Sequence, residues 1–287
     1  QVLSLKDLVE LQGGSLHLDC SRGQDCLGAR ILLPASHEET RLEISDQPEA
    51  RPVSYEFDLF HQEIGVKTGK QPMRECTYVV FDTETTGLSP SDGDEIIQIG
   101  AIRIVRGRLL HNEIIDQLVD PQRPVPPSSV EIHGIDPELL KGQPTIEKVL
   151  PRFHKFAEGA VLVAHNAAFD MKFLQLKQAR AGVRFDQPVL DTLLLSSIVH
   201  PTWGTHSLDE IAARLNVTIV GRHTALGDSI VTAEILLKLI PLLQAKGINT
   251  LEEARRAWGL GSTADLYLAE VYGLLEWFEQ DDHAGGA

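Results

Sequence analysis

The segment 79–87, with the sequence VVFDTETTG, places two carboxylates directly after a short apolar run. Residues i and i+2 of a strand project from the same face, so the side chains of Asp82 and Glu84 should point the same way. Two neighbouring carboxylates repel each other, and their burial is costly unless a cation neutralises them. A bare Asp-x-Glu would more readily be a turn-capping aspartate beside a solvated glutamate, but the longer string Asp-x-Glu-Thr-Thr-Gly favours a metal site at the end of a buried strand.

Two later segments carry further acidic residues that could complete such a site. In HNAAFD, Asp170 lies at the start of an expected helix, where the helix dipole favours a negative charge. In GRHTALGDS, His223 precedes a helix and Asp228 lies inside it. Taken one by one, these residues also fit a helix-start carboxylate, a histidine without a catalytic role and a solvated aspartate. The otherwise apolar helix around Asp228 makes the solvated position less comfortable.

Four carboxylates from separate segments and one histidine form an oxygen-rich set of possible ligands. Mg²⁺ or Mn²⁺ fits this set better than zinc, which prefers thiolates and clustered histidines. Two such ions about 4 Å apart would hold the attacking and leaving oxygens of a phosphodiester. Because a histidine titrates near neutral pH, His223 could deprotonate the attacking water. These residue types predict a metal-dependent phosphodiester hydrolase.

The strings FDTETTG, HNAAFD and HTALGD, in this order, resemble the three motifs of the DEDDh 3′–5′ exonucleases. This family includes the epsilon-type proofreading subunits of bacterial DNA polymerase III and RNase T. The resemblance covers about residues 77–243 and implies an RNase H-like fold that releases nucleoside 5′-monophosphates from a 3′ end. It implies a set of metal ligands with a general base, namely Asp82, Glu84, Asp170 and Asp228 with His223. It also implies contacts with the terminal nucleotide from Thr85, Thr86, Leu88, His133 in the string IHGI, and Phe169 by stacking.

The substrate expected from this resemblance is the 3′ end of single-stranded DNA, hydrolysed with two Mg²⁺ or Mn²⁺ ions. DNA polymerase and other replication or repair proteins are candidate partners. However, the clamp-binding stretch Gln-Leu-x-Leu-Phe that proofreading subunits usually carry has no counterpart in residues 244–287. An exoribonuclease that trims RNA ends is a second hypothesis, since no motif clearly reads a 2′-hydroxyl. A sensor or adaptor that only binds nucleic acid is a third, which the complete acidic set disfavours.

The elements that would position these motifs predict an α/β fold. Strands are expected in TYVVFD, in a hairpin over EIIQIGAIRIVRGRLLHNEIIDQLV that turns at Arg106 and Gly107, in AVLVAHN and in QPVLDT. Helices are expected in TIEKVLPRFHKFA, which Pro151 should break or kink, and in AAFDMKFLQLKQARAG, SLDEIAARLN and TALGDSIVTAEILLKLIPLLQA. A meander of strands followed by alternating helices and strands predicts a mixed five-stranded sheet with helices on both faces.

The chain is expected to have three parts. Residues 1–75 form an N-terminal remnant or linker segment, 76–243 the exonuclease domain and 244–287 a helical C-terminal extension. In the first part, SLHLDC and ARILLPA should be strands, and SLKDLVELQ a short helix. Residues 10–35 resemble the end of a histidine-kinase-type ATPase domain, but the nucleotide lid of such domains is missing, so no ATP site is expected. In the last part, Thr250 and Glu253 predict a capping box, and DLYLAEVYGLLEWFEQ predicts a further helix.

Composition limits the possible partners and compartment. The formal net charge of −15 argues against a broad nucleic-acid surface, although a basic helix face formed by Lys172, Lys177, Arg180 and Arg184 could be a local approach for phosphates rather than a solvated face. Three irregularly spaced cysteines argue against a disulfide framework and suit a reducing compartment. No run approaches the ~18 apolar residues of a membrane span. We therefore expect a cytoplasmic protein without a membrane partner.

Other polar residues receive structural interpretations. Asp191 ends an expected strand and should cap the following helix. His200 and His206 flank the loop PTWGT, where ordinary loop histidines are expected rather than a zinc site.

Overall fold

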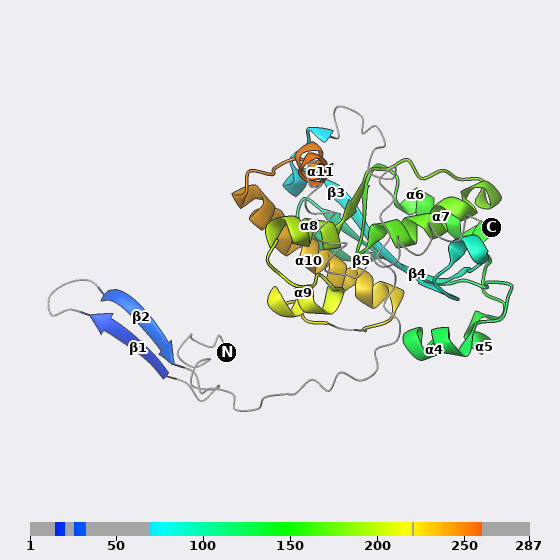
Figure 1. The fold of residues 1–287 in the computed structure, drawn as a ribbon, viewed down its shortest axis with the longest axis horizontal. Coiled ribbons are helices and arrows are strands. Elements are labelled where there is room, and N and C mark those ends of the chain that lie inside the picture. The colour runs from blue at the N-terminus through cyan, green and yellow to red at the C-terminus, as the bar shows by residue number, and fades with distance from the viewer. Residues whose placement is uncertain (1–14, 21–25, 33–68, 220, 260–287) are drawn as a thin grey trace, which may run out of the picture. The chain divides into compact units, whose positions relative to one another are not determined.

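A computed structural model of the chain describes residues 15–20, 26–32, 69–219 and 221–259 (Figure 1). Backbone contacts divide the chain into residues 1–48 and 49–287. In the first unit, β1 (Ser15–Cys20) pairs antiparallel with β2 (Cys26–Leu32), so both expected strands are present. The expected helix SLKDLVELQ lies outside the described residues, as does part of the kinase-like stretch 10–35.

The second unit contains a mixed five-stranded sheet. Its strands are β3 (Thr77–Thr85), β4 (Ile96–Val105), β5 (Arg108–Leu118), β6 (Val161–Ala164) and β7 (Val189–Asp191). Their order is β5-β4-β3-β6-β7. Strands β3, β4 and β5 are antiparallel neighbours, whereas β6 and β7 run parallel to β3. This arrangement confirms the predicted α/β fold with a mixed sheet.

The hairpin between β4 and β5 turns where the sequence predicts it. Arg106 and Gly107 have φ angles of 48° and 74°. Two consecutive residues with positive φ form the turn whose twist matches the twist of paired strands. The remaining short elements are η1 (Met73–Glu75), η2 (Pro90–Asp92), α4 (Pro127–His133) and α5 (Pro137–Leu140).

Helices cover both faces of the sheet, as expected (Figure 1). On one face, Val80 and Ile102 belong to a core that includes α8 (Thr192–Val199), α9 (Leu208–Arg214) and α10 (Ala225–Ala245). On the other face, Val79 and Phe81 pack with α6 (Ile146–Phe156) and α7 (Ala167–Ala181). Because strand side chains alternate between faces, β3 contributes to both cores. It is the central strand of the sheet and carries the first acidic motif at its end.

Two helices test the finer sequence predictions. Helix α6 continues through Pro151, so the expected break is wrong. Its buried apolar side, Ile146, Val149, Leu150 and Phe153, holds the helix against the sheet, and tertiary packing outweighs the local cost of proline.

Helix α11 (Leu251–Gly259) begins with the predicted capping box. The Thr250 backbone N–H donates to Glu253 Oε2 at 3.0 Å, and the Glu253 N–H donates to Thr250 Oγ1 at 3.2 Å. The expected helix DLYLAEVYGLLEWFEQ lies outside the described residues. Every helix within the described segments is too short or too polar to span a lipid bilayer.

Candidate active site

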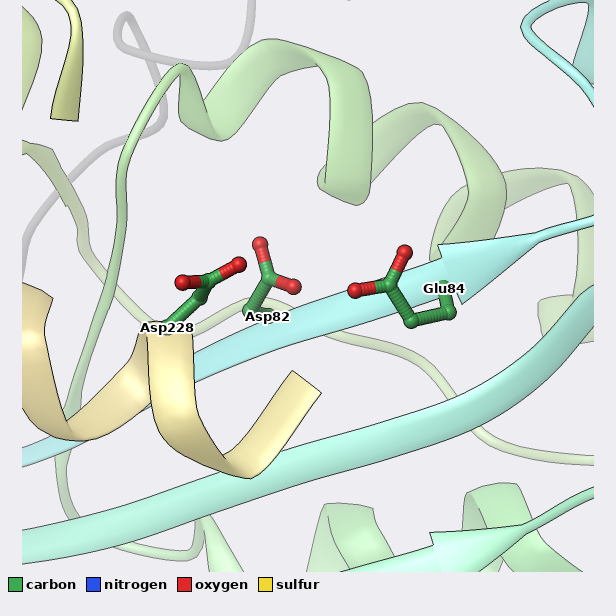
Figure 2. A group of neighbouring side chains, drawn as sticks. All are labelled: Asp82, Glu84 and Asp228. Carbon is green, nitrogen blue, oxygen red and sulfur yellow. The ribbon is translucent and has the colours of Figure 1, made fainter. Parts of the chain in front are cut away.

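Three carboxylates meet at the end of β3. Asp82 and Glu84 project from β3 toward Asp228 on α10 (Figure 2). One ligand oxygen from each residue lies within 4.8 Å of the others. The three residues are only 6%, 4% and 4% exposed. The predicted pairing of Asp82 with Glu84, and its meeting with Asp228, are therefore present in the fold.

A glycine on the neighbouring strand allows α10 to bring Asp228 this close. Gly100 lies opposite Asp82 in the β3–β4 register. A Cβ atom on Gly100 would lie 2.1 Å from the backbone of Ala225 and Leu226, so the first turn of α10 rests directly on the sheet there. Two hydrogen bonds hold this contact, from Ser229 Oγ to Gly100 O at 3.0 Å and from Ala225 N to Gln98 Oε1 at 3.2 Å. Sequence reasoning did not identify Gly100 or Gln98, because their partners are distant in the chain.

The segment ahead of α10 joins His223 to this group. Asp228 Oδ2 accepts a hydrogen bond from the His223 backbone N–H at 3.3 Å and one from Arg222 Nη1 at 2.7 Å. His223 has a left-handed φ of 61° and an exposed side chain. Thr224 caps α10 by accepting from the Gly227 N–H at 3.1 Å. These contacts fix the backbone of His223 next to Asp228.

Asp170 approaches the same strand from the α7 side. It is fully buried, and its Oδ1 accepts hydrogen bonds from the backbone N–H of Thr83 at 3.0 Å and from Thr83 Oγ1 at 2.6 Å. Thr83 lies between Asp82 and Glu84 and projects from the opposite face of the strand. Asp170 therefore adjoins the three-carboxylate group without being one of the residues that lie within 4.8 Å of one another.

Asp191 holds the turn that leads to Asp170. Its carboxylate accepts from the backbone N–H groups of Asn166 at 3.1 Å and Ala167 at 2.8 Å, and it caps α8 through Leu193 N–H at 2.8 Å. Burial raises the pKa of Asp191 to about 6, against the lowering effect of these hydrogen bonds. The predicted cap of α8 is confirmed, but the second role at the start of α7 was missed.

The polar residues expected near a terminal nucleotide lie at the end of β3 and on α4, which contact each other. Thr86 accepts a hydrogen bond at its backbone oxygen from Ser129 Oγ of α4 at 2.6 Å, which docks α4 against the end of β3. His133, at the other end of α4, is 6% exposed, and its Nδ1 accepts from the Ile135 N–H at 3.0 Å. Thr85 Oγ1 donates to Gly87 O at 2.7 Å.

The two apolar members of that expected set have different environments. Leu88 is partly buried against the core under α6 and α7. Phe169 is 4% exposed and packs against Phe173 with ring centroids 5.1 Å apart. The structure thus gives Phe169 a packing role in the core.

The basic residues of α7 are largely engaged by acidic side chains. Lys177 Nζ lies 2.8 Å from Glu95 Oε1 and donates to Asp94 O at 3.0 Å. Arg180 binds Glu95 at 3.1 Å and Glu147 at 2.6 Å. The pairs with Glu95 connect α7, which carries Asp170, with the loop that follows β3, and the pair with Glu147 connects α7 with α6. They also leave less positive charge for a phosphate approach than the sequence suggests.

The two loop histidines belong to an aromatic cluster around Trp203. His200 stacks on Trp203 with ring centroids 3.8 Å apart, and His206 Nδ1 lies 2.9 Å from Ser196 Oγ. Burial lowers the pKa of His206 to about 4. Across the part of the chain that the structure describes, Asp82, Glu84 and Asp228 are the one group arranged to hold a metal ion.

The chemistry of that group fits a divalent cation. The group gathers three buried carboxylates, and carboxylates are costly to bury close together in a poorly solvated place. All the donor atoms are oxygens, which suit Mg²⁺ or Mn²⁺. A hard cation would therefore relieve the repulsion that the fold imposes on these side chains.

Two curated bacterial proteins are similar in sequence to this chain. A "DNA polymerase III subunit epsilon-like protein" from Rhodobacter capsulatus is 52% identical over 202 residues, which is 70% of this chain and 29% of the relative. A "DNA polymerase III PolC-type" from Caldanaerobacter subterraneus subsp. tengcongensis is 40% identical over 191 residues, 66% of this chain and 13% of the relative. The chain thus spans less than a third of the length of these curated relatives.

The fold and the motifs place the chain in a family. E. coli exonuclease I in complex with a dT13 oligonucleotide shares the fold with a TM-score of 0.52 at 17% identity, over 60% of this chain and 42% of the other. Residues 79–236, more than half of the chain, match the family Exonuclease (RNase_T). This segment contains Asp82 and Glu84 of β3 and Asp228 of α10. The chain therefore belongs to the Exonuclease family of nucleases, as its three motifs predicted.

Proposed function

We propose that this chain is a two-metal 3′–5′ exonuclease that releases nucleoside 5′-monophosphates from single-stranded DNA. The observation that carries the proposal is the convergence of Asp82, Glu84 and Asp228 within 4.8 Å in a domain that matches the Exonuclease family. These three residues would hold the cations together with Asp170, which lies against the same strand through Thr83.

Each residue has a distinct part in the proposed reaction. Mg²⁺ or Mn²⁺, when bound, would polarise the phosphodiester and activate a water molecule. His223 would accept the proton of that water at a ring nitrogen, and its exposed side chain would pass the proton to solvent. The buried carboxylates Asp82 and Glu84 would keep their positions because β3 is fixed between two strands.

The end of the nucleic acid would lie between β3 and α4. Thr85, Thr86 and Leu88 would contact the terminal sugar and base, with His133 of α4 opposite them. The contact from Ser129 to Thr86 supports this placement, because it keeps the two elements together. Phe169 would support this end from the core beneath it.

Single-stranded DNA is the preferred substrate in this proposal because the relatives are named as DNA polymerase III proteins and exonuclease I was solved with dT13. The same names support a DNA polymerase as a candidate partner.

A comparison of matched DNA and RNA oligomers tests the function. The full chain is incubated with 5′-labelled strands of one sequence, with Mg²⁺, with Mn²⁺ and with excess chelator. We expect a ladder of DNA shortened from the 3′ end, 5′-monophosphate products and no cleavage in chelator. Shortening from the 5′ end or full activity in chelator would refute the proposal. Faster degradation of RNA than DNA would replace it by the exoribonuclease hypothesis.

A further inference from the structure

Arg222 connects two carboxylates from different helices. Its Nη1 lies 2.7 Å from Oδ2 of Asp228 on α10. Its Nε and Nη2 lie 2.7 Å and 3.0 Å from the two oxygens of Asp209 on α9. The guanidinium therefore contacts Asp209 through two N–H groups, one for each carboxylate oxygen, and contacts Asp228 through a third N–H group. Such planar, multipoint contacts fix geometry more strictly than a lysine ammonium could.

One of the two carboxylate oxygens of Asp228 accepts two hydrogen bonds from the segment that precedes α10. Oδ2 accepts from Arg222 Nη1 and, at 3.3 Å, from the backbone N–H of His223. These two donors fix the orientation of the Asp228 carboxylate, which lies beside Asp82 (Figure 2). Groups that hydrogen-bond to a metal-ligating side chain orient that side chain and tune its affinity for the metal.

We propose that Arg222 is a positioning residue that orients Asp228 as a metal ligand and anchors the segment carrying His223. This inference rests on the proposed function of the same site. Asp209 is 53% exposed at its side chain, whereas Asp228 is 6% exposed, so the arrangement ties a buried ligand to a surface helix. Because Asp209 balances the charge of Arg222, the bridge orients Asp228 while adding little net charge near the cation.

A charge-balanced double variant separates orientation from electrostatics. Arg222→Gln with Asp209→Asn removes one positive and one negative charge, so the net charge near the site is unchanged. We expect Mn²⁺ affinity of the full chain, measured by titration calorimetry without substrate, to fall by about 10- to 100-fold, the range for residues that orient a metal ligand. Arg256→Gln is the matched control, because Arg256 pairs with Glu252 on α11 at 3.0 Å, and its Mn²⁺ affinity should equal that of the wild type.

The results distinguish this inference from its premise. If the double variant binds Mn²⁺ as tightly as the wild type, Arg222 does not position Asp228 and the inference fails. If the wild type itself shows no Mn²⁺ binding that Asp82→Asn removes, the proposed function fails instead.

A second variant covers the case in which the double variant does not fold, as judged by its thermal transition. Arg222→Lys keeps the positive charge but cannot contact both carboxylates with one planar group. About tenfold weaker Mn²⁺ binding by Arg222→Lys supports the inference, and wild-type affinity overturns it. An affinity for Mn²⁺ that is unchanged while only KM for DNA rises would assign Arg222 to phosphate binding and would also overturn it.

Discussion

Buried carboxylates at the end of β3 determine the chemistry that single residues can perform. Asp82, Glu84 and Asp228 are each at most 6% exposed, and their ligand atoms gather within 4.8 Å. In metal-free protein this proximity is unfavourable, because like charges in a poorly solvated place repel one another. Function and stability therefore make opposite demands on these residues, and this conflict can be measured.

Replacement of Asp82 by asparagine should separate the two demands. Asp82→Asn keeps the shape of the side chain but removes one negative charge, so hydrolysis of single-stranded DNA should be abolished. The melting temperature of the metal-free protein should be equal or higher because repulsion is relieved. The measurements are turnover with Mn²⁺ and thermal unfolding in chelator. Asp186→Asn, at an exposed position, is the control and should change neither quantity. Retained turnover would remove Asp82 from the ligand set.

Replacement of His223 tests its role as the base. The residue has a φ of 61°, a conformation that asparagine tolerates, so His223→Asn avoids added backbone strain. We expect kcat to fall by about two to four orders of magnitude, the usual span for a general base. Mn²⁺ affinity should stay at the wild-type value, since the four carboxylates remain. Loss of Mn²⁺ binding together with the rate would identify His223 as a ligand.

At the scale of elements, the site depends on how closely α10 approaches the sheet. The first turn of α10 lies on β4 at Gly100, which pairs with Asp82 across the strands. The contact therefore sets the separation between the ligands of β3 and the ligand of α10. A change in this packing should act on metal binding without touching any ligand.

Gly100→Ala should disrupt that packing. The added Cβ would meet backbone atoms of Ala225 and Leu226 at 2.1 Å, so α10 must move away. We expect the free energy of unfolding to fall by about 1–3 kcal/mol, the range for overpacking, and Mn²⁺ affinity to fall with it. Urea unfolding and calorimetry measure the two effects. Gly204→Ala, where an added Cβ meets nothing within 4 Å, should leave both near wild type. Unchanged Mn²⁺ affinity in Gly100→Ala would show that the helix position is not limiting.

The elements were more predictable than their contacts. Alternating apolar residues and the Arg106–Gly107 turn indicate the strands, and acidic residues at strand and helix ends indicate the site. The spacing of residues along the chain does not reveal that Lys177 pairs with Glu95 or that Arg222 reaches Asp209, because these partners are brought together only by folding. Pro151 illustrates the same limit, since its local preference yields to the buried face of α6.

At the scale of the whole molecule, stability should depend on pH through buried groups outside the site. Burial, with the positive charges of Arg214 and His200, lowers the pKa of His206 to about 4. Burial raises the pKa of Asp191 to about 6. A histidine with a lowered pKa favours folding above its unfolded pKa of about 6.5, and this contribution is lost as pH falls through 4. An aspartate with a raised pKa contributes most below about 3.9, and its contribution is lost as pH rises through 6. The two dependences oppose each other between about pH 4 and pH 6.

His206→Asn should therefore change the slope of the stability profile. The asparagine amide can keep the hydrogen bond to Ser196 but cannot titrate, so the variant lacks the loss of stability that charging His206 causes. Relative to wild type, its free energy of unfolding should gain up to about 3 kcal/mol between pH 6.5 and pH 4, beyond any constant offset from lost packing against Trp203. Urea unfolding in chelator at several pH values measures the difference, and titration of the site carboxylates cancels because both proteins share it.

His111→Asn, at an exposed position on β5, should follow the wild-type slope. Parallel profiles for His206→Asn and the wild type would contradict this prediction, because they would mean that the pKa of His206 is the same in the folded and the unfolded chain. The raised pKa of Asp191 would then act on the stability of this nuclease in acid without an opposing effect from His206.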